Sequence, residues 1–231
     1  MALNEAVRAG ARKKIERYEG RIPHLYLDSA GRVTVGIGHL VASRGAVKAL
    51  ELHVAEKGVA GRAATDKEKL DDYDSVAKQR KGYRASWYKK HAKLVMKEAV
   101  IDALCDEHIL SFHKELQRIY REKSGYPADF DALPTDVQLA LFDMIFNLGA
   151  TKVVKVFTKF DAAVKAADWA EAAKQSNRPQ LAADRNAYVK ALLEAAAAAV
   201  AEAKRAGAAS AGGAAGADAS AVRPRAGGGS L

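Results

Sequence analysis

Near the start of the chain, the spacing of hydrophobic residues changes from one typical of a helix to one typical of strands. From Leu3 to Tyr18 the apolar side chains recur at helical intervals, which predicts an amphipathic helix. Asn4 can cap the start of this helix, and Gly20 suits the position after its end. Pro23 prevents further helix, and the stretch HLYLDSAGRVTVGIG that follows it predicts two short strands joined by a turn.

The pattern becomes irregular beyond ASRGAVKALELHVAEKG, from about residue 59 to residue 90, and then becomes helical again. Residues 94–119 carry one long apolar face. The stretch VQLALFDMIFNLG is apolar on nearly every side, so we expect a central buried helix that Thr135 caps and Gly149 ends. Residues 207–231 are rich in Ala and Gly, and we expect a disordered tail because they have too few large apolar groups to offset the entropy lost on ordering. Further amphipathic helices are predicted over residues 157–167, 169–174 and about 182–206.

Composition narrows the class of protein. A hydrophobic content of 49% in 231 residues is enough to bury the core of a globular domain. No apolar run approaches the roughly 20 residues that cross a bilayer, so we expect no membrane insertion. Frequent charges near the N-terminus argue against a Sec signal, so we expect synthesis in the cytoplasm without one. The formal net charge of +9 attracts polyanions without identifying one.

Cysteine usage limits the chemistry further. Cys105 is the only cysteine, which excludes an internal disulfide and a zinc site built on cysteines. We interpret Cys105 as a small buried hydrophobe on a helix. No metal and no cofactor are expected.

Three polar residues around the predicted hairpin can form one catalytic site. Glu19 ends the first helix, Asp28 lies in the turn and Thr34 lies on the returning strand. Two carboxylates across a cleft suit cleavage of a glycosidic bond, in which one donates a proton to the leaving oxygen and the other activates a nucleophile or stabilises positive charge. The negative end of the helix dipole favours the protonated form that a general acid needs at Glu19. Each residue also has a purely structural interpretation. Glu19 would be a solvated acid at a helix end, Asp28 a turn residue and Thr34 a strand former.

The residues around this trio resemble the phage-type lysozymes, the endolysins of glycoside hydrolase family 24. The family signature is a Glu, eight residues, an acidic residue or Cys, five residues and a Thr, which Glu19, Asp28 and Thr34 match without a gap. The stretch LYLDSAGRVTVGIGHL resembles the family's hairpin with its T-x-G-x-G-H ending, and ALFDMIFNLG resembles its core helix and following turn. The resemblance covers residues 1–40 and about 94–193.

The resemblance implies an α+β, mostly helical, lysozyme-like fold. A small β-hairpin lobe and a larger helical lobe would be joined by a long helix, with the cleft between the lobes. Residues 1–206 would form one catalytic domain, followed by the tail over 207–231. The small lobe would span about 16–93, and the helical lobe about 94–206 together with the N-terminal helix.

The resemblance also implies an activity. Glu19 would be the general acid, Asp28 would position or activate the water, and Thr34 would help to hold it, with inversion at the anomeric carbon. The chain would then be an N-acetylmuramidase that cleaves the β-1,4 bond between N-acetylmuramic acid and N-acetylglucosamine. Its partner would be the glycan strands of peptidoglycan, and we expect a monomer.

Further positions follow from the same resemblance. Leu40 and Phe146 would contact the substrate as cleft walls, and Asn147 would donate or accept a hydrogen bond at a sugar. Hairpin-end and helix-end packing are the alternative roles of these residues. Arg178 and Arg185 resemble basic positions of the family near the cleft.

The family also pairs a histidine after the second glycine with an acid on the long helix. His39 matches this histidine. The stretch ALCDEHIL offers either Asp106 or His108 as its partner. We expect a structural ion pair here rather than a catalytic role.

Residues 54–93 depart from the family as an enlarged basic insertion. No acidic residue occurs from Ser75 to Lys97, and basic residues alternate there with aromatic ones. This composition suits a nucleic-acid surface, a surface for acidic glycans or a solvated excursion. Beside the lysozyme signature, wall binding is more economical than specific nucleic-acid binding. The residues concerned are Lys78, Arg80, Lys81, Arg84, Lys89, Lys90, Lys93 and Lys97, with Tyr83, Trp87 and Tyr88.

Other classes of function stay open beside the muramidase. A lytic transglycosylase needs only the acid and would leave Asp28 and Thr34 without a role. A lysozyme-fold module that binds the cell wall or nucleic acid would not need the trio. An enzyme without a Sec signal would reach periplasmic peptidoglycan either as an endolysin released through a holin or as an antibacterial effector delivered by type VI secretion. An immunity protein and secretion machinery would then be further partners.

Overall fold

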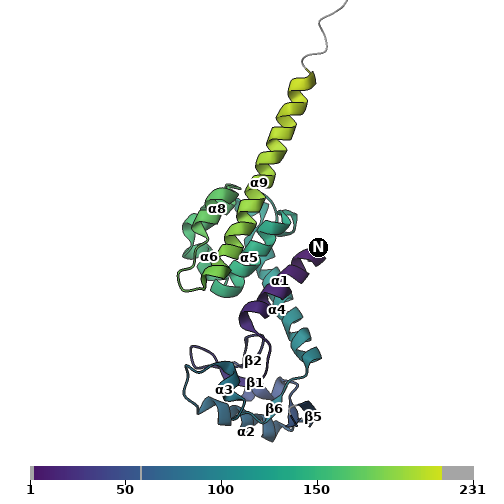
Figure 1. Cartoon of the computed structure of the whole chain (residues 1–231), viewed down its shortest axis with the longest axis vertical. Coiled ribbons are helices and arrows are strands. Elements are labelled where there is room, and N and C mark those ends of the chain that lie inside the picture. The colour runs from purple at the N-terminus through teal and green to yellow at the C-terminus, as the bar shows by residue number, and fades with distance from the viewer. Residues whose placement is uncertain (1–2, 58, 215–231) are drawn as a thin grey trace, which may run out of the picture.

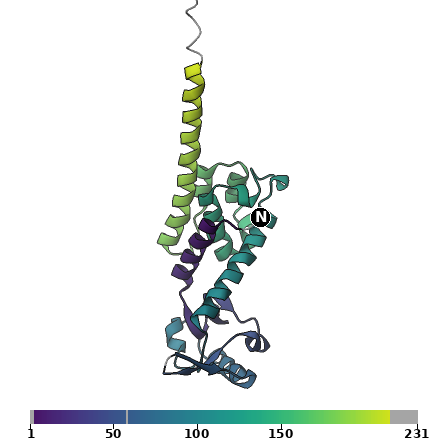
Figure 2. The ribbon, with the colours of Figure 1, turned by 90° about the vertical axis from the view of Figure 1, so that its right-hand side faces the viewer.

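The computed structural model describes residues 3–57 and 59–214, which form mostly helices together with two three-stranded antiparallel sheets. This confirms the α+β, mostly helical class. The strands and helices α2 and α3 gather at one end of the molecule, and helices α5 to α9 at the other (Figure 1). Helix α4 (Glu98–Ile119) runs between the two ends, with α1 (Glu5–Glu19) beside it (Figure 2).

Helix α1 and the hairpin after it form as predicted. The Asn4 side chain accepts a hydrogen bond from the N–H of Ala6 at 2.8 Å and so caps the helix. Gly20 follows the helix with a positive φ of 73° and donates its N–H to the Glu16 carbonyl. Strands β1 (Ile22–Leu27) and β2 (Val33–Gly36) pair in antiparallel, and β3 (His39–Leu40) adds a further short strand beside β2.

The stretch from residue 41 to residue 97 is more regular than its pattern predicts. Its sheet has the strand order β5-β4-β6, which brings Leu94 of β6 beside Val54 of β4. Leu94 therefore lies on a strand and not on the long helix, contrary to our prediction. A hydrogen bond of 2.7 Å from the Met96 N–H to the Pro23 carbonyl ties this sheet to β1. The elements are η1 (Gly45–Ala49), β4 (His53–Glu56), β5 (Val59–Ala63), α2 (Asp66–Ala77), α3 (Ala85–Tyr88) and β6 (Leu94–Val95).

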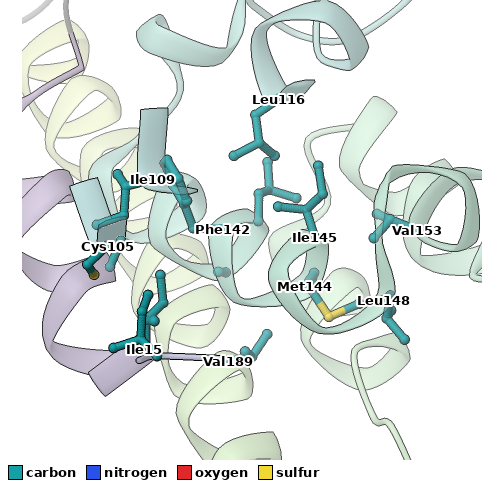
Figure 3. Packing of buried hydrophobic residues seen from close by; sticks show 14 of the residues in the cluster. Ile15, Cys105, Ile109, Leu116, Phe142, Met144, Ile145, Leu148, Val153 and Val189 are labelled. Carbon is teal, nitrogen blue, oxygen red and sulfur yellow. The ribbon is translucent and has the colours of Figure 1, made fainter. Parts of the chain in front are cut away.

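Helix α5 (Thr135–Leu148) is the central helix of the other lobe. It packs against α1, α4, α6 and α9, as its nearly uniform apolar character predicts. Gly149 ends it with a positive φ of 74°, but the Thr135 side chain is not the cap, because Pro134 holds that position without a side-chain hydrogen bond. Figure 3 shows the packing around α5, where side chains of several helices gather: Ile15, Cys105, Ile109, Phe142, Met144 and Val189.

The remaining helices pack in series, with α6 and α9 against α5 and with α7 and α8 between α6 and α9. Helix α6 (Ala150–Lys155) was not predicted, whereas α7 (Thr158–Lys165) and α8 (Trp169–Gln175) were. Short 3-10 turns, η2 (Glu122–Ser124) and η3 (Phe130–Ala132), join α4 to α5. No helix in the described part of the chain combines the length and the apolar character needed to cross a membrane.

Helix α9 (Ala183–Ala214) is longer than predicted and projects from the helical lobe (Figure 1). Among its side chains described through residue 208, the last buried one is Ala196, and residues 202–208 are exposed. Residues 207–214, which we expected to be disordered, therefore continue a helix. Alanine has the highest intrinsic helix propensity, so a helix can continue there without packing. The rest of the predicted tail, 215–231, lies outside the described residues.

Candidate functional site

Glu19 lies at the C-terminal end of α1, where its carboxylate meets two elements that are distant in the sequence. Arg185 Nη1 lies 3.4 Å from Glu19 Oε1. On the other side, a Cβ built on Gly38 would lie 3.4 Å from Glu19 Oε2. Gly38 also has a positive φ of 86°, so both its conformation and the close approach of Glu19 favour glycine there. The Glu19 side chain remains about one-third exposed, at 32%.

Asp28 lies in the β1–β2 turn, and both of its carboxylate oxygens are engaged. Oδ1 accepts the backbone N–H groups of Ala30 and Arg32, each at 2.9 Å. Oδ2 accepts Arg32 Nε at 2.8 Å and Nη2 at 2.7 Å. Burial of the Asp28 carboxyl raises its pKa, but these donors and the Arg32 charge outweigh burial and hold the pKa below its ordinary value. Asp28 is therefore a carboxylate near neutral pH, as an acceptor of a water proton must be.

Thr34 lies on β2 directly opposite Tyr26 of β1. Its side chain is buried, and Oγ1 donates to the Arg32 carbonyl at 3.1 Å. A hydroxyl that donates one hydrogen bond keeps lone pairs with which to accept another. Leu40 of β3 is the partner of Thr34 on the other side, so the three residues form one cross-strand row.

Tyr26 connects the two carboxylates electrostatically. Burial of its phenol, and then the negative charges of Glu19 and Asp28, raise the pKa of Tyr26 to about 12. Both carboxylates are therefore within electrostatic range of one phenol. The structure pairs Tyr26 with Thr34 across the strands, and the charges of Glu19 and Asp28 act on the same Tyr26. Sequence reasoning missed Tyr26, although strand alternation places it on the face of Thr34.

The Arg185 guanidinium anchors Glu19 to a buried charge network. Arg185 Nε donates to Asp143 Oδ2 of α5 at 3.2 Å, and Arg178 Nη1 donates to Asp143 Oδ1 at 2.7 Å. Arg178 is completely buried, and this burial lowers its pKa against the opposing effect of the Asp143 charge. A buried carboxylate needs such partners, because removing it from water is costly. The network fixes Arg185, and Arg185 in turn restrains Glu19.

The predicted wall residues lie at the edges of this site. Leu40 is 40% exposed, consistent with either role we considered for it. Phe146 packs edge-on against Phe112, with ring centroids 5.3 Å apart, and its own centroid lies 5.8 Å from the Arg185 guanidinium carbon. Phe146 is thereby placed near Glu19 through Arg185. In the described part of the chain, the buried Oδ1 of Asn147 has no hydrogen-bond partner.

His39 contacts His108 and not Asp106, so the expected ion pair is wrong. His39 Nδ1 lies 3.0 Å from His108 Nε2, while Asp106 pairs with Arg8 at 2.8 Å and with Arg12 at 3.3 Å. Burial lowers the pKa of both histidines. The hydrogen bond therefore joins two neutral rings, one donating and one accepting. It fastens β3 to α4 directly after Gly38.

Other features of the surface do not belong to this site. A hollow of about 410 Å³ lies beside α2 and is lined in part by Asp72 and Lys93, and another of about 470 Å³ lies beside Arg121 and Asp131. Within residues 3–57 and 59–214, no three side chains of His, Cys, Asp or Glu gather as a metal site would require. No protein-family model and no curated protein matches this chain.

Proposed function

We propose that the chain is a peptidoglycan hydrolase of lysozyme-like fold, an N-acetylmuramidase that acts by acid and base catalysis with inversion. The observation that carries the proposal is that Glu19 ends α1 against Gly38 of the strand-bearing lobe while Asp28 and Thr34 lie on the adjoining hairpin, all three at the positions of the lysozyme signature. The division into a strand-bearing lobe and a helical lobe, with α4 between them, supports the same assignment. The route to periplasmic peptidoglycan, through a holin or by type VI delivery, is part of this proposal.

In the proposed reaction, Glu19 transfers a proton to the glycosidic oxygen as the bond from that oxygen to the anomeric carbon breaks. A water attacks the anomeric carbon from the opposite face, and its proton passes to the Asp28 carboxylate. The product hemiacetal has inverted configuration, and the proton on Asp28 then returns through solvent to Glu19. Arg185 holds Glu19 Oε1, which leaves Oε2 to carry the proton.

The ion pair of Arg32 with Asp28 bears on the water-activating step. Arg32 occupies Asp28 Oδ2 in the structure, and its side chain is 62% exposed. Only the Arg32 end of the pair faces solvent, since the Asp28 side chain is 21% exposed. Water can therefore replace the solvated guanidinium at Oδ2 when the substrate arrives. The Thr34 hydroxyl, fixed by the Arg32 carbonyl, can accept a hydrogen bond from the same water.

The test is hydrolysis of purified peptidoglycan by the wild type, by Glu19→Gln and by the control Glu202→Gln on the exposed part of α9. Wild type and the control should release muropeptides, and Glu19→Gln should release none while melting at the wild-type temperature. Reaction in ¹⁸O-water should place one label on each new reducing end, at the inverted anomeric configuration.

Other products would contradict the proposal. Unlabelled 1,6-anhydro ends would indicate a lytic transglycosylase. Binding of sacculi without release by the wild type would indicate a binding module. Undiminished release by Glu19→Gln would exclude Glu19 as the acid.

A further inference from the structure

Helix α3 and the turn before it present an aromatic ring to solvent. Tyr83 and Trp87 are stacked, with ring centroids 4.1 Å apart and an angle of 9° between the rings. Trp87 is held in turn by the buried Tyr88, which meets it edge-on, and by Lys90, whose Nζ lies 4.2 Å from the Trp87 centroid. Tyr83 itself is 47% exposed. Its ring is thus held by stacking on Trp87, while about half of the residue stays accessible to a ligand.

The basic residues around Tyr83 form no ion pairs with the described part of the protein, although the charge of Lys78 acts on Asp74 and that of Lys93 acts on Asp72. All eight Lys and Arg side chains of residues 78–97 are exposed, and within the described structure none has a carboxylate within ion-pair distance. The same lobe does pair its other arginines, since Arg44 contacts Asp74 at 2.7 Å and Arg62 contacts Glu68 at 2.6 Å. Unpaired charges of one sign raise the local concentration of an oppositely charged polymer. We name these eight side chains and Tyr83, which follow one another along residues 78–97, the aromatic–basic face; Lys78 and Lys93 of this set also line the hollow beside α2.

The aromatic–basic face adjoins the turn that carries Asp28. A Cβ built on Gly31 of this turn would lie 3.2 Å from Lys81 Cδ, so the Lys81 stem lies over the turn. Helix α3 packs on β1, and the His24 ring nitrogen Nε2 lies 3.0 Å from the Ala85 carbonyl oxygen. A polymer that extends from Asp28 past Gly31 would therefore meet Lys81 of the aromatic–basic face.

We propose that the aromatic–basic face is a second binding surface for the same glycan strand, beyond the bond that is cleaved. Tyr83 stacks on a sugar ring, and the cations pair with carboxylates of the stem peptides attached to the strand. The identity of this ligand rests on the proposed function. The face is favoured as a glycan surface over a nucleic-acid surface because it continues from the Asp28 turn, and because one exposed ring, rather than a series of rings, lies among the charges.

The experiment measures binding to insoluble sacculi by co-sedimentation, with Glu19→Gln present in every protein so that the ligand is not consumed. One variant is Tyr83→Ala. A second neutralises Lys78, Lys81 and Lys89 to Gln. Its matched control neutralises Lys152, Lys155 and Lys159 to Gln, which are equally exposed on α6 and α7 and change the net charge by the same amount.

We expect the triple variant of the face to bind about tenfold more weakly at low salt, and its affinity to change less with salt than that of the parent. Tyr83→Ala should bind about fivefold more weakly. The control triple should change affinity less than about twofold. Sacculi whose carboxylates have been converted to amides should bind Glu19→Gln alone and the variant with Lys78, Lys81 and Lys89 neutralised with equal affinity. Tyr83→Ala should still weaken binding to these sacculi.

An equal loss of affinity for sacculi in the triple variant of the face and in its control would overturn the proposal, since net charge alone would then explain binding. Tighter binding to duplex DNA than to sacculi would overturn it in favour of a nucleic-acid surface. Unchanged affinity of the parent for amidated sacculi would exclude pairing with carboxylates. Failure of the proposed hydrolysis is a separate result, because it is measured as product release by the protein with Glu19 intact.

Discussion

Arg185 Nη1 lies 3.4 Å from Glu19 Oε1, so the first residue of the candidate site is held by a residue near the other end of the chain. The same guanidinium donates to Asp143 of the central helix. The position of Glu19 therefore depends on contacts among α1, α5 and α9, and these contacts form only in the complete fold.

Replacing Arg185 with Met should lower activity on peptidoglycan by about tenfold to a hundredfold, because Glu19 loses the contact that orients it. The free energy of unfolding should fall by about 1–3 kcal/mol, because Asp143 keeps only Arg178 as its charged partner. Initial rates and denaturant titrations measure the two effects.

Arg178→Met is the informative control, because Arg178 contacts Asp143 without contacting Glu19. Its unfolding free energy should fall further, by about 3–5 kcal/mol, since the fully buried Arg178 is the closer partner of Asp143. Its activity, measured well below its melting temperature, should fall less than that of Arg185→Met. A larger activity loss in Arg178→Met would contradict the orienting role of Arg185.

Replacing Arg32 with Gln should move the acid limb of the pH–activity profile to higher pH. Arg32 helps to hold the pKa of Asp28 below its ordinary value, so removing the guanidinium lets that pKa rise. The variant must then reach a higher pH before Asp28 is a carboxylate. Initial rates on peptidoglycan across the acid range measure the shift.

Arg44→Gln removes a similarly exposed arginine, one that pairs with Asp74 on the same lobe. Its acid limb should stay at the wild-type position. If the pH–activity profiles of Arg32→Gln and wild type have their acid limbs at the same pH, ionisation of Asp28 does not limit the reaction.

The sequence predicts much of the hairpin and little of the surroundings of the trio. Local rules suffice for the Asn4 cap, the Gly20 and Gly149 helix ends and the two strands, because each depends on a few neighbouring residues. The sheet β5-β4-β6 was missed, since its strands are short and Leu94 pairs with a residue far away along the chain. Thr135 was wrongly assigned as a cap because Pro134 can begin the helix without one.

The sequence predicted fewer of the contacts around the candidate site than of the elements of the fold. No local pattern indicates that Arg32 covers Asp28, and the sequence could not decide between Asp106 and His108 as the partner of His39. Motif spacing locates Glu19 and Asp28 along the chain. Their electrostatic partners come from tertiary packing, which a periodic pattern does not encode.

Asp72 makes the stability of the fold depend on pH. Burial raises the pKa of Asp72 to about 6, against the effect of hydrogen bonds from the backbone N–H groups of Lys93 and Leu94. Below about pH 4, both the folded and the unfolded chain hold the proton on this residue, so it costs no stability. As the pH rises to about 6, the unfolded chain ionises first, and stability is lost and stays lost above that pH.

Replacing Asp72 with Asn removes this ionisation. The melting temperature of the variant relative to wild type should therefore increase between about pH 4 and pH 6, with a change in unfolding free energy of up to about 3 kcal/mol. The difference below pH 4 serves as the internal control, since it contains only the effect of exchanging the hydrogen-bonding group. A difference that does not vary with pH would contradict the raised pKa.

The projecting part of α9 should contribute little to stability. Up to residue 208, the last buried side chains of α9 are Leu193 and Ala196, and residues 202–208 are exposed. A chain that ends after Ala206 should therefore melt within about 2 °C of the full chain and hydrolyse peptidoglycan at the same rate. A chain that ends after Leu192 loses both buried side chains, and its unfolding free energy should fall by at least about 3 kcal/mol. Thermal melts of the two truncated chains and the full chain test this. A large destabilisation of the chain that ends after Ala206 would show that the distal helix packs against another surface. If that surface belongs to a second copy of the chain, the stability of the full chain should also rise with protein concentration.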